Sequence, residues 1–351
     1  MQAVILVGGK ATRLRPLTFN TLKAMVPVLN VSFLEHVIRS LSHHHVDDII
    51  VTLSSGSQSI RSCYGDGSQF GVKLNYVVED APRGTAGAVK NAERYLQGAF
   101  LVLNGDIFTD LDISAMLEFH RQREAKATIA LTPVDDPTSY GLVEVDTQGR
   151  VTRFLEKPGR DKVTTNMINA GIYVLEADIL AQIPSQGEFS FERELFPSLL
   201  EQGKPVYAYP SFAYWMDIGT PEKYLRLHWD LLNGKSSQHT FAPGEDTVIG
   251  KQSYVHPSAQ MKGAVLIGDN CHIGREVKLT GPIVIGSGCT IESGAEVEGS
   301  VIWHSVQIGR GVLVRNSVIA NNSSIHYGCR VLDGLVLGSN VVVFNDYQLE
   351  P

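Results

Sequence analysis

Two glycines and two arginines lie close to the start of the chain. Gly8 and Gly9 come directly after the apolar run Val4–Val7, and Arg13 and Arg15 follow shortly afterwards. Glycine lets the backbone turn sharply and approach a ligand with no Cβ in the way, and free N–H groups in such a turn bind phosphate. Arginine adds a bidentate contact to phosphate oxygens. The stretch therefore favours a nucleoside triphosphate site, although two glycines after a strand also form ordinary turns.

Two lysines add positive charge to the same region. Lys10 lies within the glycine turn, and Lys23 follows soon afterwards, ahead of the proline-containing apolar segment Ala24–Val28. The region contains neither G-x-x-x-x-G-K-[ST] nor G-x-G-x-x-G, the two common phosphate-binding fingerprints. The phosphate interpretation therefore depends on the glycines and cations taken together.

Two aspartates are candidate ligands for a divalent cation. Asp106 follows the apolar run Phe100–Leu103 after an Asn-Gly pair, and Asp217 lies in the segment Trp215–Pro221. Carboxylate oxygens suit a Mg²⁺ ion that is also bound by phosphate. Each aspartate has another interpretation, because Asp106 could cap a following helix and Thr220 before a proline is typical of a helix N-cap. The N-cap and a metal role for Asp217 are compatible.

Polar residues in later stretches are candidates for sugar binding. Glu156 and Lys157 follow a predicted strand and could bind a hydroxyl and a phosphate, although alone they also fit an ordinary surface pair. Asn169 could bind a hydroxyl through its amide. Gly141 would let a backbone N–H approach a substrate.

A carboxylate and a glycine-containing helix start are candidates for recognition of a nucleobase. Glu79 follows the predicted strand Lys73–Val78, and Gly84 and Thr85 lie at the start of the next helix. Guanine presents N1–H and N2–H₂ side by side, which match the two acceptor oxygens of a carboxylate. Uracil and thymine present an acceptor–donor–acceptor edge that a carboxylate would repel. If Glu79 faces the base, the sequence favours guanine.

The elements that must position these residues alternate along residues 1–232. Apolar runs predict strands at Ala3–Val7, Asp48–Leu53, Lys73–Val78, Phe100–Leu103, Ala127–Pro133, Leu142–Val145 and Ala170–Leu175, and helical spacing predicts helices at Phe33–Leu41, Ala86–Tyr95 and Ile113–Arg123. This order predicts an α/β fold with a Rossmann-like, mostly parallel sheet and helices on both faces. In such sheets ligands bind at the carboxyl ends of strands, where the Gly8–Arg15 and Asn104–Asp106 loops lie.

The last third of the chain carries a six-residue repeat. An apolar residue returns at every sixth position from Ile249 to Val297, the next in step is Trp303, and the register slips there and again after Ala320. A hexapeptide repeat predicts a parallel β-helix, in which three short strands form one coil. We therefore expect a catalytic domain at residues 1–232, a polar linker at 233–247 and a β-helix at 248–351.

Composition narrows the class of protein. The chain has 351 residues, a formal net charge of −7 and 43% hydrophobic residues, which predicts roughly two globular domains and disfavours binding to nucleic acid or a membrane surface. Cys271 and Cys289 fall at inward or stacked positions of the repeat, so they are expected in the core, with no disulfide framework. No leader or membrane-length apolar run is recognised, so a cytoplasmic location is expected. The flat apolar sides of the repeat favour a homo-oligomer.

These motifs together resemble the sugar-1-phosphate nucleotidyltransferase family. The resemblance covers nearly the whole chain and keeps the family's order: Gly8-Gly9-x-x-Thr12-Arg13-Leu14-Arg15-Pro16-Leu17-Thr18, Lys23, Asn104-Gly105-Asp106, Glu156-Lys157-Pro158, Asn169-Ala170-Gly171 and Asp217-Ile218-Gly219-Thr220. Within the family, Gly84–Gly87 and the C-terminal repeat, there a left-handed β-helix, resemble the branch that makes GDP-mannose from GTP and mannose 1-phosphate.

The resemblance implies a Mg²⁺-dependent reaction in which a sugar phosphate attacks the α-phosphorus of a nucleoside triphosphate and releases pyrophosphate. It implies that Arg13 holds the pyrophosphate, that Lys23 neutralises the α-phosphate, and that Asp106 and Asp217 hold the metal. Lys157 would bind the sugar phosphate. The expected nucleotide-binding residues are Leu6, Gly8, Gly9, Thr12, Arg13, Glu79, Gly84 and Thr85, and the expected sugar-phosphate-binding residues are Gly141, Glu156, Lys157, Asn169 and Thr220.

Three positions depart from the family's usual residues. Ala11 stands where the family has glycine, Leu22 where it has proline, and Ser32 where proline is frequent. If position 11 needs a positive φ, alanine strains the loop by about 1 kcal/mol. Leu22 gives up a rigid approach to Lys23 but keeps the lysine.

Three other functions stay open. The chain could be an adenylyl-, thymidylyl- or uridylyltransferase acting on glucose 1-phosphate, or a non-catalytic regulatory subunit that binds a nucleotide-sugar. It could also be an acyltransferase that uses a histidine of the β-helix. The presence of Arg13, Lys23, Asp106 and Asp217 argues against the regulatory subunit, and the repeat has no inserted loop to hold an acyl carrier.

Overall fold

The computed structural model describes residues 1–9, 11–54, 58–238, 247–345 and 348–349. Lys10 and most of the expected linker therefore lie outside the described residues. The chain forms two compact units, one made of residues 1–9 and 37–215 and the other of residues 10–36 and 216–351. The domain boundaries expected at 232 and 248 stay a prediction.

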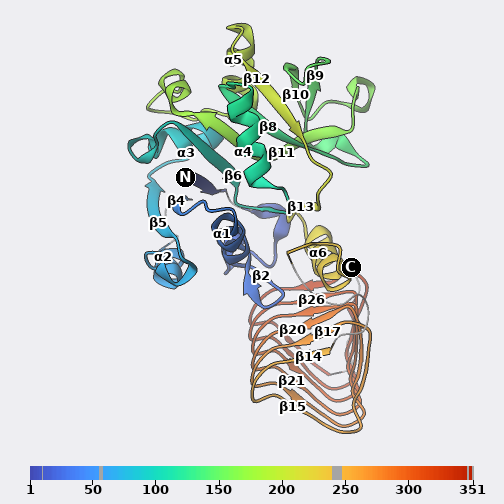
Figure 1. Cartoon of the computed structure of the whole chain (residues 1–351). Coiled ribbons are helices and arrows are strands. Elements are labelled where there is room, and N and C mark those ends of the chain that lie inside the picture. Colours follow the sequence, from blue (N-terminus) through green and yellow to red (C-terminus); the bar gives the residue numbers. More distant parts are fainter. Residues whose placement is uncertain (10, 55–57, 239–246, 346–347, 350–351) are drawn as a thin grey trace. The chain divides into compact units, whose positions relative to one another are not determined.

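The first unit contains a nine-stranded sheet with the order β10-β9-β11-β6-β1-β4-β5, in which β8 pairs with β11 and β12 pairs with β8 (Figure 1). These strands are β1 (Gln2–Val7), β4 (Asp48–Ser54), β5 (Lys73–Glu79), β6 (Ala99–Asn104), β8 (Ala127–Pro133), β9 (Gly141–Val145), β10 (Val151–Glu156), β11 (Met167–Glu176) and β12 (Val206–Pro210). Strands β4 and β6 pair with β1 in parallel, and β11 joins β6 in the antiparallel direction. The Rossmann-like α/β fold expected from the sequence is confirmed.

The first unit contains helices between its strands. They are α2 (Gln58–Tyr64), α3 (Gly84–Asn91), α4 (Ile113–Gln122) and α5 (Phe196–Glu201), while α1 (Phe33–His43) begins in the second unit. Of these, α3, α4 and α5 pack against the sheet. Helix α3 packs against β1 and β5, and α4 packs against β8, β11 and β12. Large side chains such as Phe100, Tyr173, Phe191 and Phe196 fill the core between them. The sequence predicted α1, α3 and α4 but not α2 or α5.

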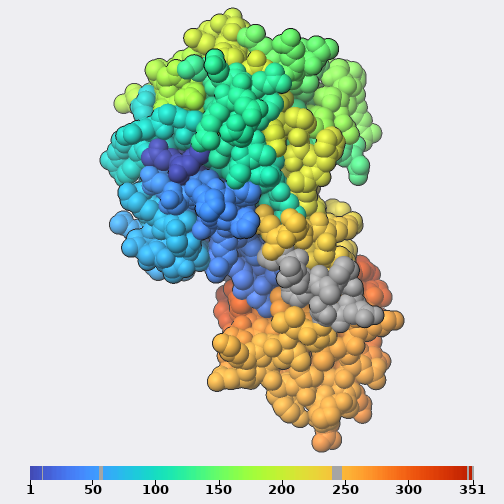
Figure 2. Space-filling view, in the orientation of Figure 1, coloured from blue at the N-terminus to red at the C-terminus, as the bar shows by residue number. Residues whose placement is uncertain are grey.

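The second unit contains the parallel β-helix. Its three sheets each hold six parallel strands, with the orders β14-β17-β20-β23-β26-β29, β15-β18-β21-β24-β27-β30 and β16-β19-β22-β25-β28-β31 (Figure 1). The first sheet runs from β14 (Thr247–Ile249) to β29 (Val336–Leu337), the second from β15 (Tyr254–Val255) to β30 (Val342–Val343), and the third from β16 (Gln260–Lys262) to β31 (Gln348–Leu349). The described residues of the coils drawn in orange in Figure 2 form a continuous surface. The hexapeptide-repeat fold is confirmed.

The inward register corrects one expectation. Trp303 and Ala320 were in step with the repeat, but Ile302 and Ile319 occupy the inward positions and pair in line with Ile285. Two corners of the prism are one residue shorter than the others because serine side chains close them. The buried Ser300 Oγ donates to the carbonyl of Glu298, and Ser317 closes the next coil in the same way. Trp303 is thereby buried outside the interior of the coils.

The second unit also contains short elements ahead of the β-helix in each of its two chain segments. Short 3-10 helices at Thr12–Leu14 and Lys23–Met25 precede the hairpin of β2 (Pro27–Val28) and β3 (Val31–Ser32), and α6 (Pro221–Leu232) precedes the β-helix. Cys271 and Cys289 are buried in the interior of the coils, as expected. Among the described residues, no helix is long and apolar enough to cross a membrane.

Candidate active site

The carboxyl ends of β1 and β6 lie side by side. Leu6 is opposite Asn104 in the register, and the N–H of Gly105 donates to the carbonyl of Leu6 at 2.9 Å. A Cβ on Gly105 would lie 2.6 Å from that carbonyl oxygen, so only glycine allows this approach. Asp106 is therefore held at the carboxyl-terminal end of β6, beside the carboxyl-terminal end of β1. Strand β7 (Ile107–Thr109) follows it, so the helix-cap interpretation of Asp106 is wrong.

The glycine pair leaves open space beside the backbone. Gly8 and Gly9 are both exposed, and Gly9 has a φ of +99°. A Cβ built on either glycine would meet none of the described atoms within 4 Å. The turn therefore leaves room for a ligand to approach the backbone, as a phosphate site requires.

The loop that carries Arg13 has a left-handed residue at its start. Ala11 has φ 45° and ψ 38°, and its carbonyl accepts a hydrogen bond of 2.8 Å from the Thr18 hydroxyl. This loop therefore needs the positive φ for which the family uses glycine. Leu22, by contrast, has a φ of −63° and an extended ψ, which is the conformation that proline would impose ahead of Lys23.

Asp217 is a buried carboxylate with a cation beside it. Its Oδ1 forms a 2.5 Å ion pair with Lys223 Nζ, and only 7% of Asp217 is exposed. A Cβ on Gly219 would lie 2.7 Å from Asp217 Oδ2 and 3.3 Å from Arg13 Nη2, so this glycine makes room for both side chains. The Thr220 hydroxyl accepts from the Lys223 N–H at 3.4 Å, which confirms the N-cap of α6.

Glu156 and Lys157 lie at the end of the β9–β10 ribbon. Glu156 is opposite Gly141 in the register, and its Oε1 is 3.4 Å from Lys157 Nζ. A Cβ on Gly141 would lie 2.9 Å from the Phe154 ring and 3.1 Å from Glu156 Oε2. Gly141 therefore makes room for these two side chains, while the Lys157 side chain remains 60% exposed.

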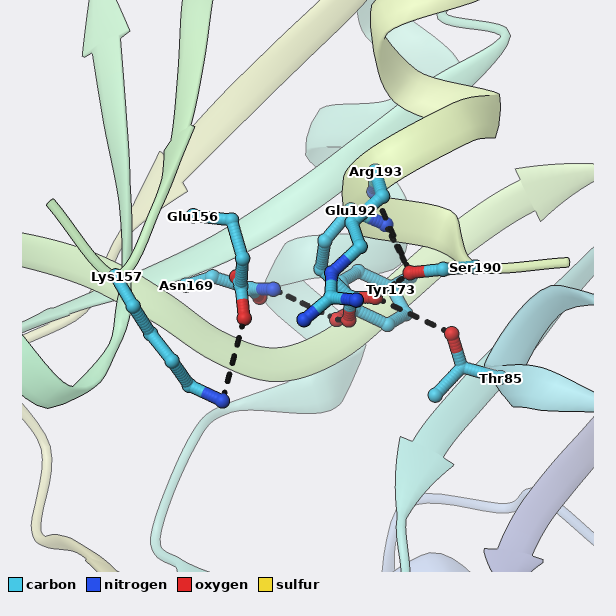
Figure 3. A network of polar contacts seen from close by, with 8 residues as sticks. All are labelled: Thr85, Glu156, Lys157, Asn169, Tyr173, Ser190, Glu192 and Arg193. Atoms are coloured by element: carbon cyan, nitrogen blue, oxygen red, sulfur yellow. Dashed lines mark hydrogen bonds and ion pairs between the residues drawn. The ribbon is translucent and has the colours of Figure 1, made fainter.

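The amide of Asn169 is held at both ends, and Figure 3 shows the end that contacts Tyr173. Its Oδ1 accepts from the Gly171 N–H at 2.9 Å, and its Nδ2 donates to the Tyr173 hydroxyl at 2.7 Å. The strand register shifts between Asn169 and Tyr173, where Gly171 has a φ of +72°. A Cβ on Gly171 would lie 2.6 Å from Asn104 Nδ2, so the irregular segment packs closely on the end of β6.

Glu79 ends β5 with an unpaired buried oxygen. Its Oε1 has no hydrogen-bond partner among the described residues. Burial raises the pKa of Glu79 above its usual value, and the positive charge of Arg83 opposes that rise. An unpaired buried acceptor is costly, and a ligand N–H would satisfy it.

Gly84 and Thr85 have partners within the chain. Gly84 has a φ of +69°, and a Cβ there would lie 2.7 Å from the carbonyl oxygen of Phe189. The Thr85 hydroxyl donates to Glu192 at 3.2 Å and accepts from the Phe191 N–H at 3.0 Å. Both residues therefore join the start of α3 to residues 189–192.

Two family models match the chain. The nucleotidyl transferase model matches residues 2–234, and the GMPPB C-terminal domain model matches residues 261–350. The chain belongs to the nucleotidyl transferase family. The expected site residues of this nucleotidyl transferase are divided between its units. The second unit carries Thr12, Arg13, Lys23, Asp217 and Thr220, and the first unit carries the other expected site residues.

Relatives align with this chain over most of their own length. A mannose-1-phosphate guanyltransferase of Candida albicans is 37% identical and aligns over 99% of this chain and 93% of its own. A mannose-1-phosphate guanylyltransferase of Mycobacterium tuberculosis is 35% identical over 90% of this chain and 83% of its own. A UTP–glucose-1-phosphate uridylyltransferase of Synechocystis is 33% identical over 96% of this chain and 87% of its own. The crystal structure of HddC from Yersinia pseudotuberculosis complexed with GMP-PN is 31% identical with a TM-score of 0.56, and it covers 64% of this chain and 97% of that one.

The carboxylates of this nucleotidyl transferase fit a magnesium ion that arrives with phosphate. No three His, Cys, Asp or Glu side chains form a metal cage in the described part of the chain. Mg²⁺ is usually held by one or two carboxylates together with substrate phosphates and water. Asp217 presents hard oxygen atoms beside Lys223, whose positive charge already stabilises the carboxylate. The donor set is therefore suitable for Mg²⁺ bound jointly by protein and triphosphate.

Sequence reasoning missed Tyr173 and Glu192. Tyr173 is completely buried, and its hydroxyl donates to Glu192 Oε1 at 3.0 Å. Burial and the nearby carboxylate of Glu192 raise the pKa of Tyr173 well above its usual value, so it stays neutral. In the sequence Tyr173 fits an ordinary strand and Glu192 an ordinary charged turn. Their contact joins β11 to residues 191–195, which are separate elements of the sequence.

Proposed function

We propose that this nucleotidyl transferase makes GDP-mannose and pyrophosphate from GTP and mannose 1-phosphate. The observation that carries the proposal is the extent of the similarity. A mannose-1-phosphate guanyltransferase aligns with 99% of this chain at 37% identity, and the GMPPB C-terminal domain model matches residues 261–350. The β-helix, which a catalytic domain does not require, is thus shared as well.

The choice of nucleotide is supported by Glu79. Its carboxylate has a buried oxygen with no partner among the described residues. Guanine would place N1–H and N2–H against such a carboxylate, whereas the acceptor atoms of uracil would face its negative charge. In the proposed mode, Gly84 and Thr85 also bind the nucleotide, at the start of α3.

In the proposed reaction an oxygen of mannose 1-phosphate attacks the α-phosphorus of GTP. A new P–O bond forms while the bond to the β-phosphate bridging oxygen breaks, and pyrophosphate leaves with the electron pair. The protein positions the phosphates and neutralises charge, since covalent catalysis is not required. Arg13 holds the leaving pyrophosphate and Lys23 the α-phosphate. Lys157 binds the sugar phosphate, while Glu156, Asn169 and the Gly141 backbone bind sugar hydroxyls.

Mg²⁺ is the proposed metal, with Asp106 and Asp217 as its protein ligands. When bound, it would offset the negative charge of the phosphate oxygens. Asp217 would exchange part of its contact with Lys223 for the ion, since the two cations compete for one carboxylate. Self-association also remains a proposal.

The test is a pyrophosphate-release assay with GTP, ATP, UTP and dTTP, each combined with mannose, glucose and N-acetylglucosamine 1-phosphates. We expect the highest kcat/KM with GTP and mannose 1-phosphate. The second candidate, UTP with glucose 1-phosphate, is favoured by the Synechocystis relative, 33% identical over 96% of this chain. A preference for UTP would contradict the role of Glu79. Absence of turnover with every pair would favour a non-catalytic subunit.

A further inference from the structure

Glu192 lies at the centre of a hydrogen-bond network in the first unit. It belongs to the short π-helix Phe191–Leu195, and Figure 3 shows its carboxylate between Tyr173 and Thr85. Its Oε1 accepts from the Tyr173 hydroxyl at 3.0 Å. Its Oε2 accepts from the Ser190 hydroxyl at 2.7 Å and from the Thr85 hydroxyl at 3.2 Å. One carboxylate thus joins two regions expected to bind different substrates.

The carboxylate fixes the direction of the hydrogen bonds toward Asn169. A carboxylate only accepts, so the single proton of the Tyr173 hydroxyl points to Glu192. The Tyr173 oxygen must then accept, and the group that donates to it at 2.7 Å is the NH₂ of Asn169. The other end of the amide agrees, because Asn169 Oδ1 accepts from the Gly171 N–H at 2.9 Å. The orientation of this amide is therefore determined twice.

The same argument shows what Asn169 can still offer to a ligand. Among the described residues, one lone pair of its Oδ1 and one of its two N–H groups are used. The second N–H group is left to donate, and Oδ1 keeps a second lone pair. Asn169 is only half-buried, and Figure 3 shows it on the same side of Tyr173 as Glu156 and Lys157. In the proposed mode, Asn169 meets a sugar hydroxyl through this second N–H group.

The other oxygen of Glu192 holds the loop at the start of α3. The Thr85 hydroxyl donates to Glu192 and accepts from the Phe191 N–H at 3.0 Å. The N–H groups of Ala86 and Gly87 add bonds of 2.9 and 3.0 Å to the carbonyl of Phe189. The loop proposed to support the base is therefore attached to the π-helix that carries Glu192.

We propose that Glu192 is a positioning residue with two effects. It sets the orientation of the Asn169 amide, whose free N–H group donates to the sugar, and it anchors the start of α3 at Thr85 beside the base. The proposal rests on the proposed function, because that function assigns Asn169 to the sugar and Thr85 to the nucleotide. Glu192 contacts neither substrate. It acts through Tyr173 on one side and Thr85 on the other.

The experiment measures KM for each substrate separately in four variants. Glu192→Gln can donate as well as accept, so it removes the fixed direction and we expect both KM values to rise about tenfold, the scale of one hydrogen bond to a charged group. Tyr173→Phe keeps the aromatic packing and should raise only the sugar-phosphate KM. Thr85→Ala should raise only the nucleotide KM, and Thr85→Ser, which restores the hydroxyl, should return it toward wild type.

The matched control is Glu194→Gln in the same π-helix. Glu194 is exposed, and its carboxylate accepts from the Ser190 N–H at 2.5 Å, a bond that a glutamine oxygen can also accept. Glu194 contacts only the backbone N–H of Ser190, so the change removes the same charge and leaves the side-chain hydrogen bonds of Glu192 in place. Both KM values should stay within twofold of wild type. Melting temperatures of all variants separate loss of fold from loss of positioning.

A double-mutant cycle separates positioning from a structural role. In the Asn169→Ala background, Glu192→Gln should leave the sugar-phosphate KM unchanged, since the amide it orients is gone, but should still raise the nucleotide KM. A lower melting temperature with both KM values unchanged in Glu192→Gln would overturn the proposal, as would additive effects on the sugar KM. If Glu192→Gln does not fold, Tyr173→Phe tests the effect on the sugar-phosphate KM and Thr85→Ala tests the effect on the nucleotide KM.

The proposal and the proposed function fail in different ways. If wild type prefers another nucleotide and sugar phosphate, the proposed function is wrong, and the same KM values are measured with the preferred pair. If wild type turns over no pair, the same separation is measured as dissociation constants for GTP and mannose 1-phosphate. Absence of any binding would overturn both.

Discussion

The indole Nε1 of Trp303 donates a hydrogen bond of 2.9 Å to the hydroxyl of Tyr224. That hydroxyl donates in turn to the backbone carbonyl of Pro27. Tyr224 lies on α6, Trp303 on a shortened coil of the β-helix, and Pro27 just after the 3-10 helix that begins at Lys23. Asn30 adds a second contact by donating to the carbonyl of Ile285 at 2.9 Å. The coils therefore support the segment that carries a proposed catalytic lysine.

The first prediction is that this support affects catalysis. Trp303→Phe keeps an aromatic ring but removes the donor, and Tyr224→Phe leaves both the indole N–H and the Pro27 carbonyl without this partner. Each buried group left unsatisfied costs about 1–3 kcal/mol. We expect lower stability to denaturant in both variants, with the larger loss in Tyr224→Phe, and a several-fold lower kcat, measured by pyrophosphate release.

Trp229 provides the matched control for that prediction. It lies on the same helix, and its indole N–H donates to the carbonyl of Gly299 in the β-helix at 2.8 Å instead of to the Tyr224 hydroxyl. Trp229→Phe should lower stability in a similar way and leave kcat unchanged. Equal loss of kcat in both tryptophan variants would mean that the coils stabilise the fold but do not position Lys23.

The second prediction concerns the strained residue in the glycine loop. Ala11 has a φ of 45°, a conformation that costs an L-residue roughly 1–2 kcal/mol. Ala11→Gly removes this strain but increases the freedom of the unfolded chain, which costs roughly 0.5–1 kcal/mol. We expect stability equal to or slightly above wild type. Ala11→Val, which is β-branched, should destabilise the loop and raise the nucleotide KM. A clear loss of stability in Ala11→Gly would contradict the strain.

Ala11 and Trp303 show how much of the fold could be predicted from the sequence. Local signals were sufficient for β1, α3 and the repeat, because hydrophobic periodicity and glycine spacing are visible in one dimension. Ala11 could be named as a departure, but its φ depended on the folded loop. Trp303 was expected inside the coils, and a serine-closed corner moved it outside.

The site was predictable only in part for the same reason. Residue types and a family resemblance identified candidates such as Lys157 and Asn169. The side chains that hold those candidates were not predictable, because their contacts join distant segments. Glu192 is 19 residues from Tyr173 and 107 from Thr85 along the chain. No spacing rule relates such pairs.

The third prediction concerns stability in acid. Burial lowers the pKa of His228 from 6.5 to about 3, with a smaller contribution from the nearby His36 and an opposing one from the Pro27 carbonyl. Between these two values the unfolded chain binds a proton that the folded chain does not, so stability falls as the pH drops from 6.5 toward 3. His228 packs on Tyr224 with ring centroids 4.7 Å apart. His228→Leu should reduce the pH dependence of the melting temperature in this range. An unchanged slope would contradict the assignment.

The fourth prediction concerns Lys23. If it neutralises charge at the α-phosphate, Lys23→Ala should lower kcat about a hundredfold or more, the usual loss for a group that stabilises transition-state charge. Lys204, an exposed lysine of the first unit, is the control, and Lys204→Ala should retain wild-type kcat. A change in KM alone for Lys23→Ala would indicate binding without a role in the chemical step.

The fifth prediction concerns the base and the proton of Glu79. Burial raises the pKa of its carboxyl above 4.5, with Arg83 opposing. Only the ionised carboxylate accepts both guanine N–H groups, so the KM for GTP should rise as the pH falls through the raised pKa. The rise should exceed that of the KM for mannose 1-phosphate, whose own phosphate takes up a proton at about pH 6. The effect on stability has the opposite sign. Because the folded state holds the proton more tightly, stability is lost as the pH rises from 4.5 through the raised pKa. Glu79→Gln should therefore be at least as stable as wild type at neutral pH. It should have a weaker preference for GTP over UTP, and its KM for GTP should depend less steeply on pH than that of wild type. If the variant keeps both the preference and the pH dependence, Glu79 does not contact the base, and the argument for guanine would rest on the relatives alone.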